Sequence, residues 1–363
     1  MRLSWTLSAY LGRRFLGGFV FAGLGLLGIV FLFELIEVLR ATANREEVDF
    51  GIVLALSLLD LPLLAQKILP FAMLFGAMFT FARLTRNHEL VVARAAGVSV
   101  WQFLLPASFL ALVIGLFVVG IFNPLSTVAA SRHDQMEAKY LHGTASLLAL
   151  SQGGLWLRQV DAEGQSVIHA ESVSQQGLVL NQVIIFLYEG TDKFGRIDAR
   201  TATLGRGVWT LDDAVISNLD VPGRFFDSYT VPTSLNLEQI QDSFASPESM
   251  SFWALPGFIS LLQEAGFAAL KHRIHWHSVL SIPLLLVAMV LLAATFSLRL
   301  SRRGGTGLLV AGGVMAGFVL FFMTDLALAL GLSGKIPPIL AAWTPAGVST
   351  LLGLSLLFHL EDG

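Results

Sequence analysis

The sequence predicts a polytopic α-helical membrane protein with six transmembrane helices and an all-β, jelly-roll-like domain inserted between the third and the fourth. The first reason is composition: the 363-residue chain is 55% hydrophobic and 13% charged, with a mean hydropathy of +0.71. A soluble core of this size does not use so much apolar sequence. The second reason is that six apolar runs are long enough to cross a bilayer. The third is that one stretch between them alternates as β-strands do.

Each apolar run exceeds the roughly 20 residues that a helix needs to cross about 30 Å of hydrocarbon. The runs cover residues 15–38, 52–82, 98–123, 274–298, 306–331 and 337–358. Pro62 and Pro70 lie within the second run and predict bends in that helix. The first run is longer than the apolar part of a signal peptide, which has about 7–15 residues, so we expect it to stay uncleaved.

Arginine and lysine in the short loops orient the spans, because cytoplasmic loops carry an excess of them. One side of the predicted topology holds nine of these residues and the other side holds three, which are Arg40, Arg45 and Lys335. The nine are Arg2, Arg13, Arg14, Arg83, Arg86, Arg94, Arg299, Arg302 and Arg303. We therefore expect both termini in the cytoplasm and the β insert on the far side of the membrane.

The β insert is predicted over residues 129–265. Runs of alternating or β-branched residues cover 156–173, 178–190 and 196–219, with turn signals every eight to twelve positions. That spacing favours a sandwich or a jelly roll over βαβ units. Such a domain beside a membrane could bind an amphipathic ligand or serve as a receptor-like ectodomain, and the pattern alone leaves both open. Residues 246–265 suggest one or two helices that return to the membrane.

A charged segment between the second and third spans, TRNHELVVARAAGVS (85–99), is predicted to form a short amphipathic helix. On a helical wheel, one arc holds Arg86, Glu89, Leu90, Ala93 and Arg94, and the opposite arc holds Val91, Val92, Ala95 and Ala96. Thr85 or Asn87 is suited to cap its start, and Gly97 to end it. We expect the charged arc to face the cytoplasm and the valines to pack on the protein's own helices. The helix either anchors the turn at the membrane surface or docks a partner.

A resemblance to a known family favours docking. Residues 70–97, PFAMLFGAMFTFARLTRNHELVVARAAG, resemble the P…L.G.…RL.R..EL…RAAG segment of the LptF/LptG family of lipopolysaccharide-export permeases. The likeness continues through FELIEVLR in the first span, through Asn123 and Pro124, and through FSLRLSRRGG (296–305) and GLSGKIPPILAAWTP (331–345). It implies a permease subunit of an ABC transporter in the bacterial inner membrane, with the β domain in the periplasm. Such a transporter extracts lipopolysaccharide and hands it to a periplasmic bridge.

The resemblance also implies partners. They are an LptF-like permease homologue, a cytoplasmic LptB-like ATPase dimer, and LptC/LptA-like bridge proteins built as β jelly rolls. In the family the charged segment is the coupling helix that docks into the ATPase, which assigns Arg86, Glu89, Leu90 and Arg94 to coupling. This chain has no G-x-x-x-x-G-K-[ST] loop, so we expect it to bind no cofactor, with ATP and magnesium used by the partner.

Charged residues within or beside the spans are candidates for lipid binding, because an ionised side chain in the bilayer needs a partner or a wet cavity. Lys67 is in the second span, where it either pairs with Asp60 or lines a cavity for anionic head groups. Arg40 shares the outer end of the first span with two glutamates, and KHRIHWH (271–277) places Lys271 and Arg273 at the start of the fourth. We assign Arg40, Lys67, Lys271 and Arg273 to substrate binding.

Small residues in the fifth span predict a close helix contact. Gly313 and Gly317 form a G-x-x-x-G pattern, which permits close approach of a second helix. In the family the first and fifth spans form gates with the related permease, so the resemblance favours a partner helix over internal packing.

Other functions receive less support. The net charge of −3 gives no reason to expect nucleic acid, the absence of cysteine excludes thiol chemistry, and no H-E-x-x-H or G-x-S-x-G motif is present. We therefore predict no catalytic residue and no metal site. The alternatives are a force-transmitting ABC permease that moves no lipopolysaccharide and a membrane sensor with a β ectodomain. The predicted domains are 1–128 (three spans and the coupling helix, about 85–97), 129–265 (β domain) and 266–363 (three spans).

The topology is open to a direct test. A periplasm-active reporter fused at Gly363 should be inactive, whereas the same reporter inserted within residues 129–265 should be active, because the positive charges hold the termini inside. A reporter at Gly363 that is active only outside the cytoplasm would reverse the topology.

Overall fold

The computed structural model divides into two compact units. The helical unit comprises Met1–Met136, Ser251–Trp253 and Arg273–Gly363, and the β unit comprises Glu137–Met250 and Ala254–His272. The structure describes all residues except 1–4, 44–47, 138–139, 141–147, 152–153, 162–163, 175–178, 190–191, 206, 219–220, 234–245, 265–267, 298–305 and 363.

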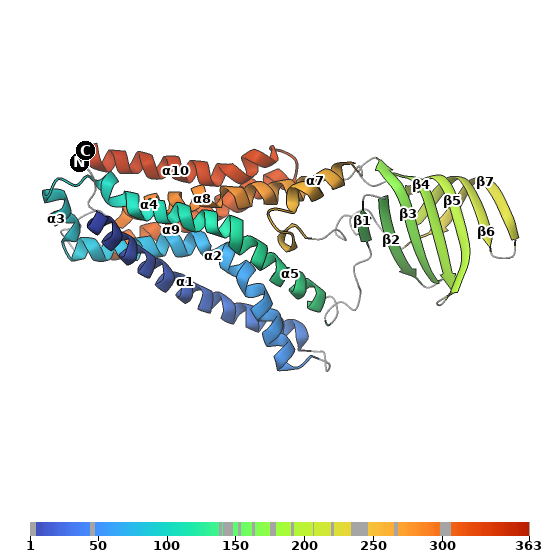
Figure 1. Ribbon diagram of the computed structural model, residues 1–363, viewed down its shortest axis with the longest axis horizontal. Coiled ribbons are helices and arrows are strands. Elements are labelled where there is room, and N and C mark those ends of the chain that lie inside the picture. Colours follow the sequence, from blue (N-terminus) through green and yellow to red (C-terminus); the bar gives the residue numbers. More distant parts are fainter. Residues whose placement is uncertain are drawn as a thin grey trace. The chain divides into compact units, whose positions relative to one another are not determined.

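The prediction of six membrane spans is confirmed by the long helices of the described chain (Figure 1). Six are long and apolar enough to cross a membrane: Trp5–Thr42, Phe50–Arg86, Val100–Glu137, Leu270–Ser297, Ala311–Leu332 and Pro338–His359. The helices themselves are α1 (Trp5–Thr42), α2 (Phe50–Arg86), α3 (Glu89–Ala95), α4 (Val100–Phe117), η1 (Val118–Phe122), α5 (Asn123–Glu137), α8 (Leu270–Ser297), α9 (Thr306–Leu332) and α10 (Pro338–Asp362). The start of α1, the end of α10 and the short α3 lie at the same end of the helical unit.

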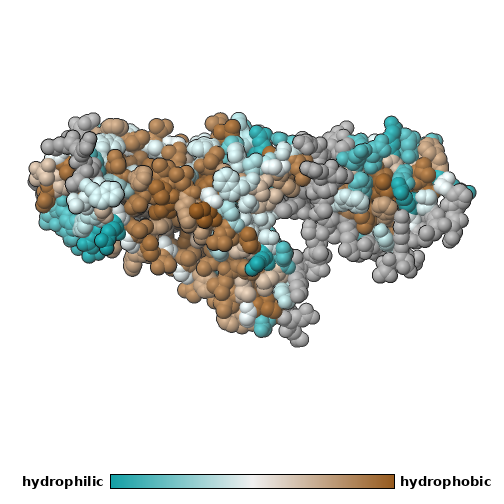
Figure 2. Space-filling model, in the orientation of Figure 1, coloured by the Kyte–Doolittle hydropathy of each residue, from teal (hydrophilic) through white to brown (hydrophobic). Residues whose placement is uncertain are grey.

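The surface of the helical unit is apolar where lipid would meet it. Large side chains point outward along the spans, including Leu24 and Phe33 of α1, Phe109 of α4 and Phe322 of α9, all more than half exposed. Figure 2 shows this as a continuous brown area over the long helices. A water-soluble monomer rarely exposes so large an apolar patch, so this surface is suited to contact with acyl chains.

Helices α1 and α2 approach each other closely where both carry glycine. A Cβ atom added at Gly76 would lie 2.6 Å from the Cα of Phe19, and one at Gly18 would lie 2.8 Å from the carbonyl oxygen of Gly76. The Thr80 hydroxyl donates to that same carbonyl at 2.8 Å. No side chain can fit between the two backbones here, which is the usual role of small residues in membrane helix packing.

The third span is one helix interrupted by a π turn. It runs as α4, η1 and α5 from Val100 to Glu137, well beyond the apolar run 98–123. Asn123, 2% exposed, begins α5, and its side chain accepts a hydrogen bond from the Phe252 backbone at 2.8 Å and donates to Gln66 of α2 at 3.3 Å. Gln66 also contacts the Ser126 hydroxyl. These bonds satisfy polar groups that would otherwise be buried without partners.

The β unit is a single antiparallel sheet. Its strands are β1 (Leu148–Ser151), β2 (Gly154–Asp161), β3 (Gly164–Ser174), β4 (Val179–Glu189), β5 (Asp192–Leu204), β6 (Val208–Asn218) and β7 (Val221–Pro232). Alternate residues such as Leu155, Leu157 and Ile185 are buried on one face, whereas Trp156 between them is partly exposed. Leu262 of α7 (Leu255–Glu264) joins the same apolar cluster, so α7 helps to cover that face.

The strand order differs from the predicted jelly roll. The described strands pair in chain order from β1 to β7, whereas a jelly roll contains Greek keys, in which strands pair out of order. Alternating hydrophobicity predicts which residues face a core, but it does not encode the pairing order of strands joined by short turns. The jelly-roll topology is therefore not confirmed, although the antiparallel β domain is.

We predict that Gly76→Ala lowers the stability of the helical unit. The new methyl group would meet the backbone of Phe19, and such overpacking costs about 1–3 kcal/mol. The measurement is the thermal unfolding midpoint of the full chain in detergent. Gly25→Ala is the matched control, because a Cβ there meets nothing within 4 Å. Equal midpoints for the two variants would contradict the prediction.

Candidate functional site

The short helix α3 begins with a sharp change of direction after α2. His88 adopts a left-handed backbone conformation, with φ of 57°, and no side chain caps the first turn of α3. The prediction that Thr85 or Asn87 caps the helix is wrong. The Thr85 hydroxyl donates to the Ser297 carbonyl of α8 at 3.2 Å, and the Asn87 amide donates to the Glu89 carboxylate at 3.3 Å. The direction of α3 is therefore set by the His88 backbone and by tertiary contacts.

The end of α3 agrees with the sequence prediction. Gly97 has φ of 85°, a left-handed conformation that glycine adopts without strain. The Gly97 N–H donates to the Arg94 carbonyl at 2.9 Å, and the Val98 N–H donates to the Ala93 carbonyl at 3.1 Å. This pair of bonds is a Schellman motif, which satisfies the last carbonyls of the helix. Ser99 then caps α4 and donates its own backbone N–H to Gln102.

The predicted facing of α3 is wrong. Leu90 is 2% exposed and belongs to the core of the helical unit, with Ala93 packed against that core. Val91 and Val92 are 41% and 69% exposed instead. Both arcs of the helix contain apolar residues, and burying the larger leucine side chain contributes about 1.5–3 kcal/mol. The exposed surface of α3 consequently carries two valines beside Arg94, which is also exposed.

Glu89 is held by the first helix of the same chain. The Tyr10 hydroxyl donates to the Glu89 carboxylate at 2.9 Å, and Arg14 donates to the Tyr10 oxygen at 3.2 Å. The Arg14 guanidinium also lies 5.3 Å from the centre of the Tyr10 ring. Sequence reasoning missed Tyr10, because nothing in a linear pattern pairs residues that are 79 positions apart. The carboxylate thus links α3 to α1.

A pocket of about 450 Å³ opens between α1, α2 and the start of α3. It is lined by Arg13, Arg14, Gly17, Gly18, Phe21, Phe79, Thr80, Arg83, Leu84 and Glu89. Its position next to the Tyr10–Glu89 contact places it at the same end of the helical unit as α3. Three arginines and one glutamate give its wall a net positive charge.

A whole-chain comparison identifies the family of this helical unit and its β insert. The model of the family described as lipopolysaccharide export system permease LptF/LptG matches residues 9–359. The chain belongs to the LptF/LptG family. This one family match therefore covers the six spans, the β unit after the third span and the short charged helix after the second.

Among individual relatives, LptG proteins match a larger share of this chain than LptF does. The lipopolysaccharide export system permease protein LptG of Escherichia coli (strain K12) is 26% identical over 84% of this chain and 84% of its own length. LptG of Haemophilus influenzae is 22% identical over 98% of this chain and 99% of its own. LptF of Escherichia coli (strain K12) is 29% identical, but over only 41% of this chain and 39% of its own.

The other residues assigned to coupling in the LptF/LptG motif differ in accessibility. Arg86 is exposed in the last turn of α2, and Arg94 is exposed in the last turn of α3. Leu90 is buried, so it is not available to a partner. Glu89 is partly exposed, with both carboxylate oxygens accepting hydrogen bonds. A partner of α3 would therefore meet the valines and the arginines first.

Charges within the spans form a loose group on α1, α2 and α5. Lys67 is exposed on α2 and, among the described residues, makes no ion pair with Asp60. Asp60, His133 and Lys67 all lie close enough to Glu34 of α1 to interact with it electrostatically. Of the two alternatives for Lys67, the ion pair with Asp60 is therefore not formed among the described residues, and the ammonium group of Lys67 remains accessible.

The remaining candidate lipid ligands lie at helix ends. Arg40 is exposed in the last turn of α1. Lys271 and Arg273 are exposed at the start of α8. Exposure at a helix end suits contact with a head group, but the structure does not bring these three cations into one site with Lys67.

Gly313 and Gly317 pack within the chain. A Cβ atom at Gly313 would collide with the Met78 side chain, and one at Gly317 would lie 2.9 Å from Leu74 Cδ2. Both neighbours belong to α2, which occupies this face of α9. The prediction that these glycines contact a partner helix is therefore wrong.

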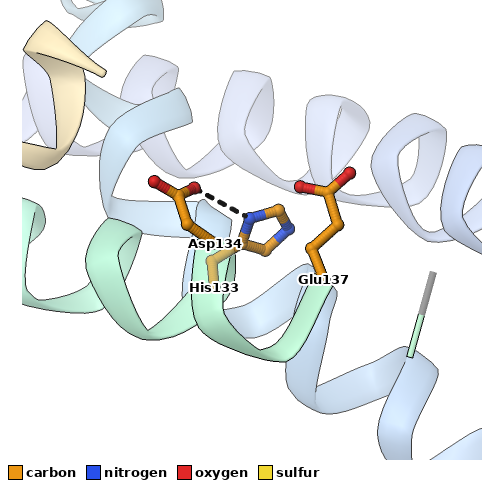
Figure 3. A group of neighbouring side chains, drawn as sticks. All are labelled: His133, Asp134 and Glu137. Atoms are coloured by element: carbon orange, nitrogen blue, oxygen red, sulfur yellow. Dashed lines mark ion pairs between the residues drawn. The ribbon is translucent and has the colours of Figure 1, made fainter. Parts of the chain in front are cut away.

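One group with metal-ligand chemistry was not predicted. His133, Asp134 and Glu137 lie in the last turns of α5, with one ligand atom from each within 4.8 Å of the others (Figure 3). The His133 ring faces the Asp134 carboxylate at 3.7 Å. Asp134 is exposed, and exposed carboxylates are often close together without an ion. The spacing H-D-x-x-E could have revealed this group in the sequence.

We predict that Tyr10→Phe loosens α3. Loss of the hydrogen bond to the partly exposed Glu89 carboxylate should cost about 1 kcal/mol, which raises amide hydrogen exchange in residues 89–95 about fivefold. Tyr229→Phe, in strand β7, is the matched control and should leave that exchange unchanged. Unaltered exchange in Tyr10→Phe would show that Leu90 alone holds the helix.

Proposed function

We propose that this protein is a non-catalytic permease subunit of an ABC transporter that extracts lipopolysaccharide from the bacterial inner membrane and passes it to a periplasmic bridge. The observation that carries the proposal is the family match over residues 9–359, together with six spans and the helix α3 after the second. An LptF-like homologue would complete the membrane part. ATP and magnesium would be used by a cytoplasmic LptB-like ATPase dimer.

The helix α3 is the proposed entry point for mechanical work. Leu90 is buried in the core of the helical unit, so a displacement of α3 also displaces the side chains packed around it. The hydrogen bond from Tyr10 to Glu89 joins α3 to α1, and the two-residue turn at Asn87 and His88 joins it to α2. A push on α3 would thus reach the first two spans together.

The exposed face of α3 supports a partner with an apolar groove. Val91 and Val92 project outward, with Arg86 and Arg94 exposed beside them. A short amphipathic helix that places apolar anchors in a groove is a common recognition mode, and charged residues at its rim add specificity. We therefore assign contact with the ATPase to these valines and arginines. Glu89 would instead hold α3 in place.

Lipid contacts are proposed for the cationic residues near the spans. Lys67, beside Glu34 and Asp60, has an accessible ammonium that could bind a lipid phosphate. Arg40, Lys271 and Arg273 are exposed and could bind further phosphates or sugars at the outer surface. Acidic neighbours of Lys67 would weaken its attraction for phosphate, so this site is expected to contribute orientation more than affinity.

The β unit supports a link to bridge proteins of the LptC/LptA type. Among the described strands, β7 forms one edge of the sheet, and its residues 223–230 are exposed, including Phe225 and Phe226. An exposed edge strand has unpaired backbone N–H and C=O groups and can accept a strand from another chain. The buried face, lined by aliphatic side chains, would accept acyl chains if the sheet opened.

We predict that Val92→Asp uncouples the transporter. A carboxylate placed in an apolar groove loses its hydration without gaining a partner, which costs several kcal/mol. Cells depleted of the wild-type protein and supplied with this variant should accumulate lipopolysaccharide in the inner membrane, and ATPase recovered with the purified variant should fall about tenfold or more.

Val92→Leu is the matched control for this experiment, because it keeps the apolar surface; it should restore both export and co-purification. Normal co-purification and normal export with Val92→Asp would exclude α3 as the docking helix. If depletion itself leaves lipopolysaccharide at the outer membrane unchanged, the proposed function is wrong.

A further inference from the structure

The proposed export function assigns no ligand to the arginine pocket beside α3, yet the chemistry of its wall points to one. Arg13, Arg14 and Arg83 line it, and all three are exposed. Arg13 and Arg14 are adjacent on α1, and Arg83 lies on α2, so the two helices present cations to the same space of about 450 Å³. Three guanidinium groups around one opening repel each other unless an anion lies between them.

The single carboxylate in the wall does not neutralise these cations. Glu89 accepts hydrogen bonds from the Tyr10 hydroxyl and the Asn87 amide, and within the described residues it forms no ion pair with an arginine. Arg14 donates to the neutral Tyr10 oxygen. Among the described residues, Arg13 and Arg83 have no carboxylate within 4.0 Å. The pocket therefore retains a net positive charge of about two and guanidinium groups that can still bind an acceptor.

The pocket changes from charged to apolar along its length. Phe21 of α1 and Phe79 of α2 line the part that lies farther from α3, with ring centres 5.7 Å apart. They are 70% and 50% exposed. Arg13 precedes Phe21 by eight residues, about 12 Å along a helix, and Arg83 follows Phe79 by four, about 6 Å. Both helices thus place arginines at the α3 end and aromatic rings toward the middle of the spans.

This arrangement fits an amphipathic anion whose charged part is at the membrane surface. We propose that the pocket binds an anionic phospholipid of the leaflet on the α3 side, with its phosphate at Arg13 and Arg83 and its acyl chains along Phe21 and Phe79. Guanidinium groups match the oxygen geometry of phosphate, and each cation near an anionic membrane surface strengthens binding. The site lies at the end of the unit that carries α3, and it does not depend on which lipid the transporter moves.

A glycine makes the space available. Gly17 lines the pocket, and a Cβ atom there would meet nothing within 4 Å. A leucine at this position would extend into the space that the lipid requires while leaving every arginine in place. Gly25, two turns farther along α1, has equally open surroundings and does not line the pocket. Gly17→Leu and Gly25→Leu are therefore a matched pair that tests occupancy without changing charge.

The experiment measures binding of dioleoylphosphatidylglycerol and dioleoylphosphatidylcholine to the full chain, purified in detergent, by native mass spectrometry. The wild-type protein should prefer phosphatidylglycerol. The double variant Arg13→Gln/Arg83→Gln should bind it about 25-fold more weakly, about fivefold for each arginine. Arg86→Gln, an exposed arginine outside the pocket, should bind within about twofold of wild type, since only surface attraction is lost. Gly17→Leu should weaken binding and Gly25→Leu should not.

Several outcomes would overturn the proposal. Equal binding of the two phospholipids by the wild-type protein would remove the anion site, as would normal phosphatidylglycerol binding by the double variant. A third arm adds millimolar inorganic phosphate. If phosphate displaces the lipid and Gly17→Leu has no effect, the pocket binds free phosphate and not a phospholipid. Thermal unfolding of each variant verifies folding, and because the Gln substitutions are at exposed positions, a folded double variant is expected.

Discussion

The contact between α1 and α2 is the constraint on which the rest of the helical unit depends. Gly18 and Gly76 let the two backbones approach so closely that no β-carbon fits between them at Gly76. With the helices in this register, Tyr10 reaches Glu89, and Arg13 faces the same space as Arg83. A larger residue at either glycine would separate the helices and would disturb the α3 attachment and the pocket together. Packing at one crossing point thus positions both candidate functional surfaces.

The helix α3 illustrates how a short segment is held without strong helix-forming power of its own. Seven residues are too few for an isolated helix to be stable in water. The burial of Leu90, the Schellman motif at Gly97 and the bond from Tyr10 to Glu89 supply the missing stability through tertiary contacts. Because these anchors use the inner face, the outer face remains free for Val91 and Val92. A rigidly held helix with an apolar outer face is what a mechanical coupling element requires.

The sequence predicted the elements better than their contacts. Length and hydropathy were sufficient for six spans, and Gly97 for the end of α3, because these depend on local chemistry. The facing of α3 could not be predicted, since Leu90 and Val92 are both apolar and only the position of the core decides which is buried. The facing of Gly313 could not be predicted for the same reason, because a spacing motif does not say which helix lies opposite. Tyr10 needed the fold to reveal it.

The two candidate surfaces are connected through Glu89. This residue lines the arginine pocket and also ties α3 to α1. Glu89 repels an anion in the pocket, whereas Arg13, Arg14 and Arg83 attract it, so with one carboxylate against three guanidinium groups the anion is still favoured. The same arginines also attract Glu89, so an anion that draws them away would leave the carboxylate dependent on Tyr10. Lipid in the pocket would then influence how firmly α3 is held, and therefore how directly a push on Val91 and Val92 reaches the first two spans.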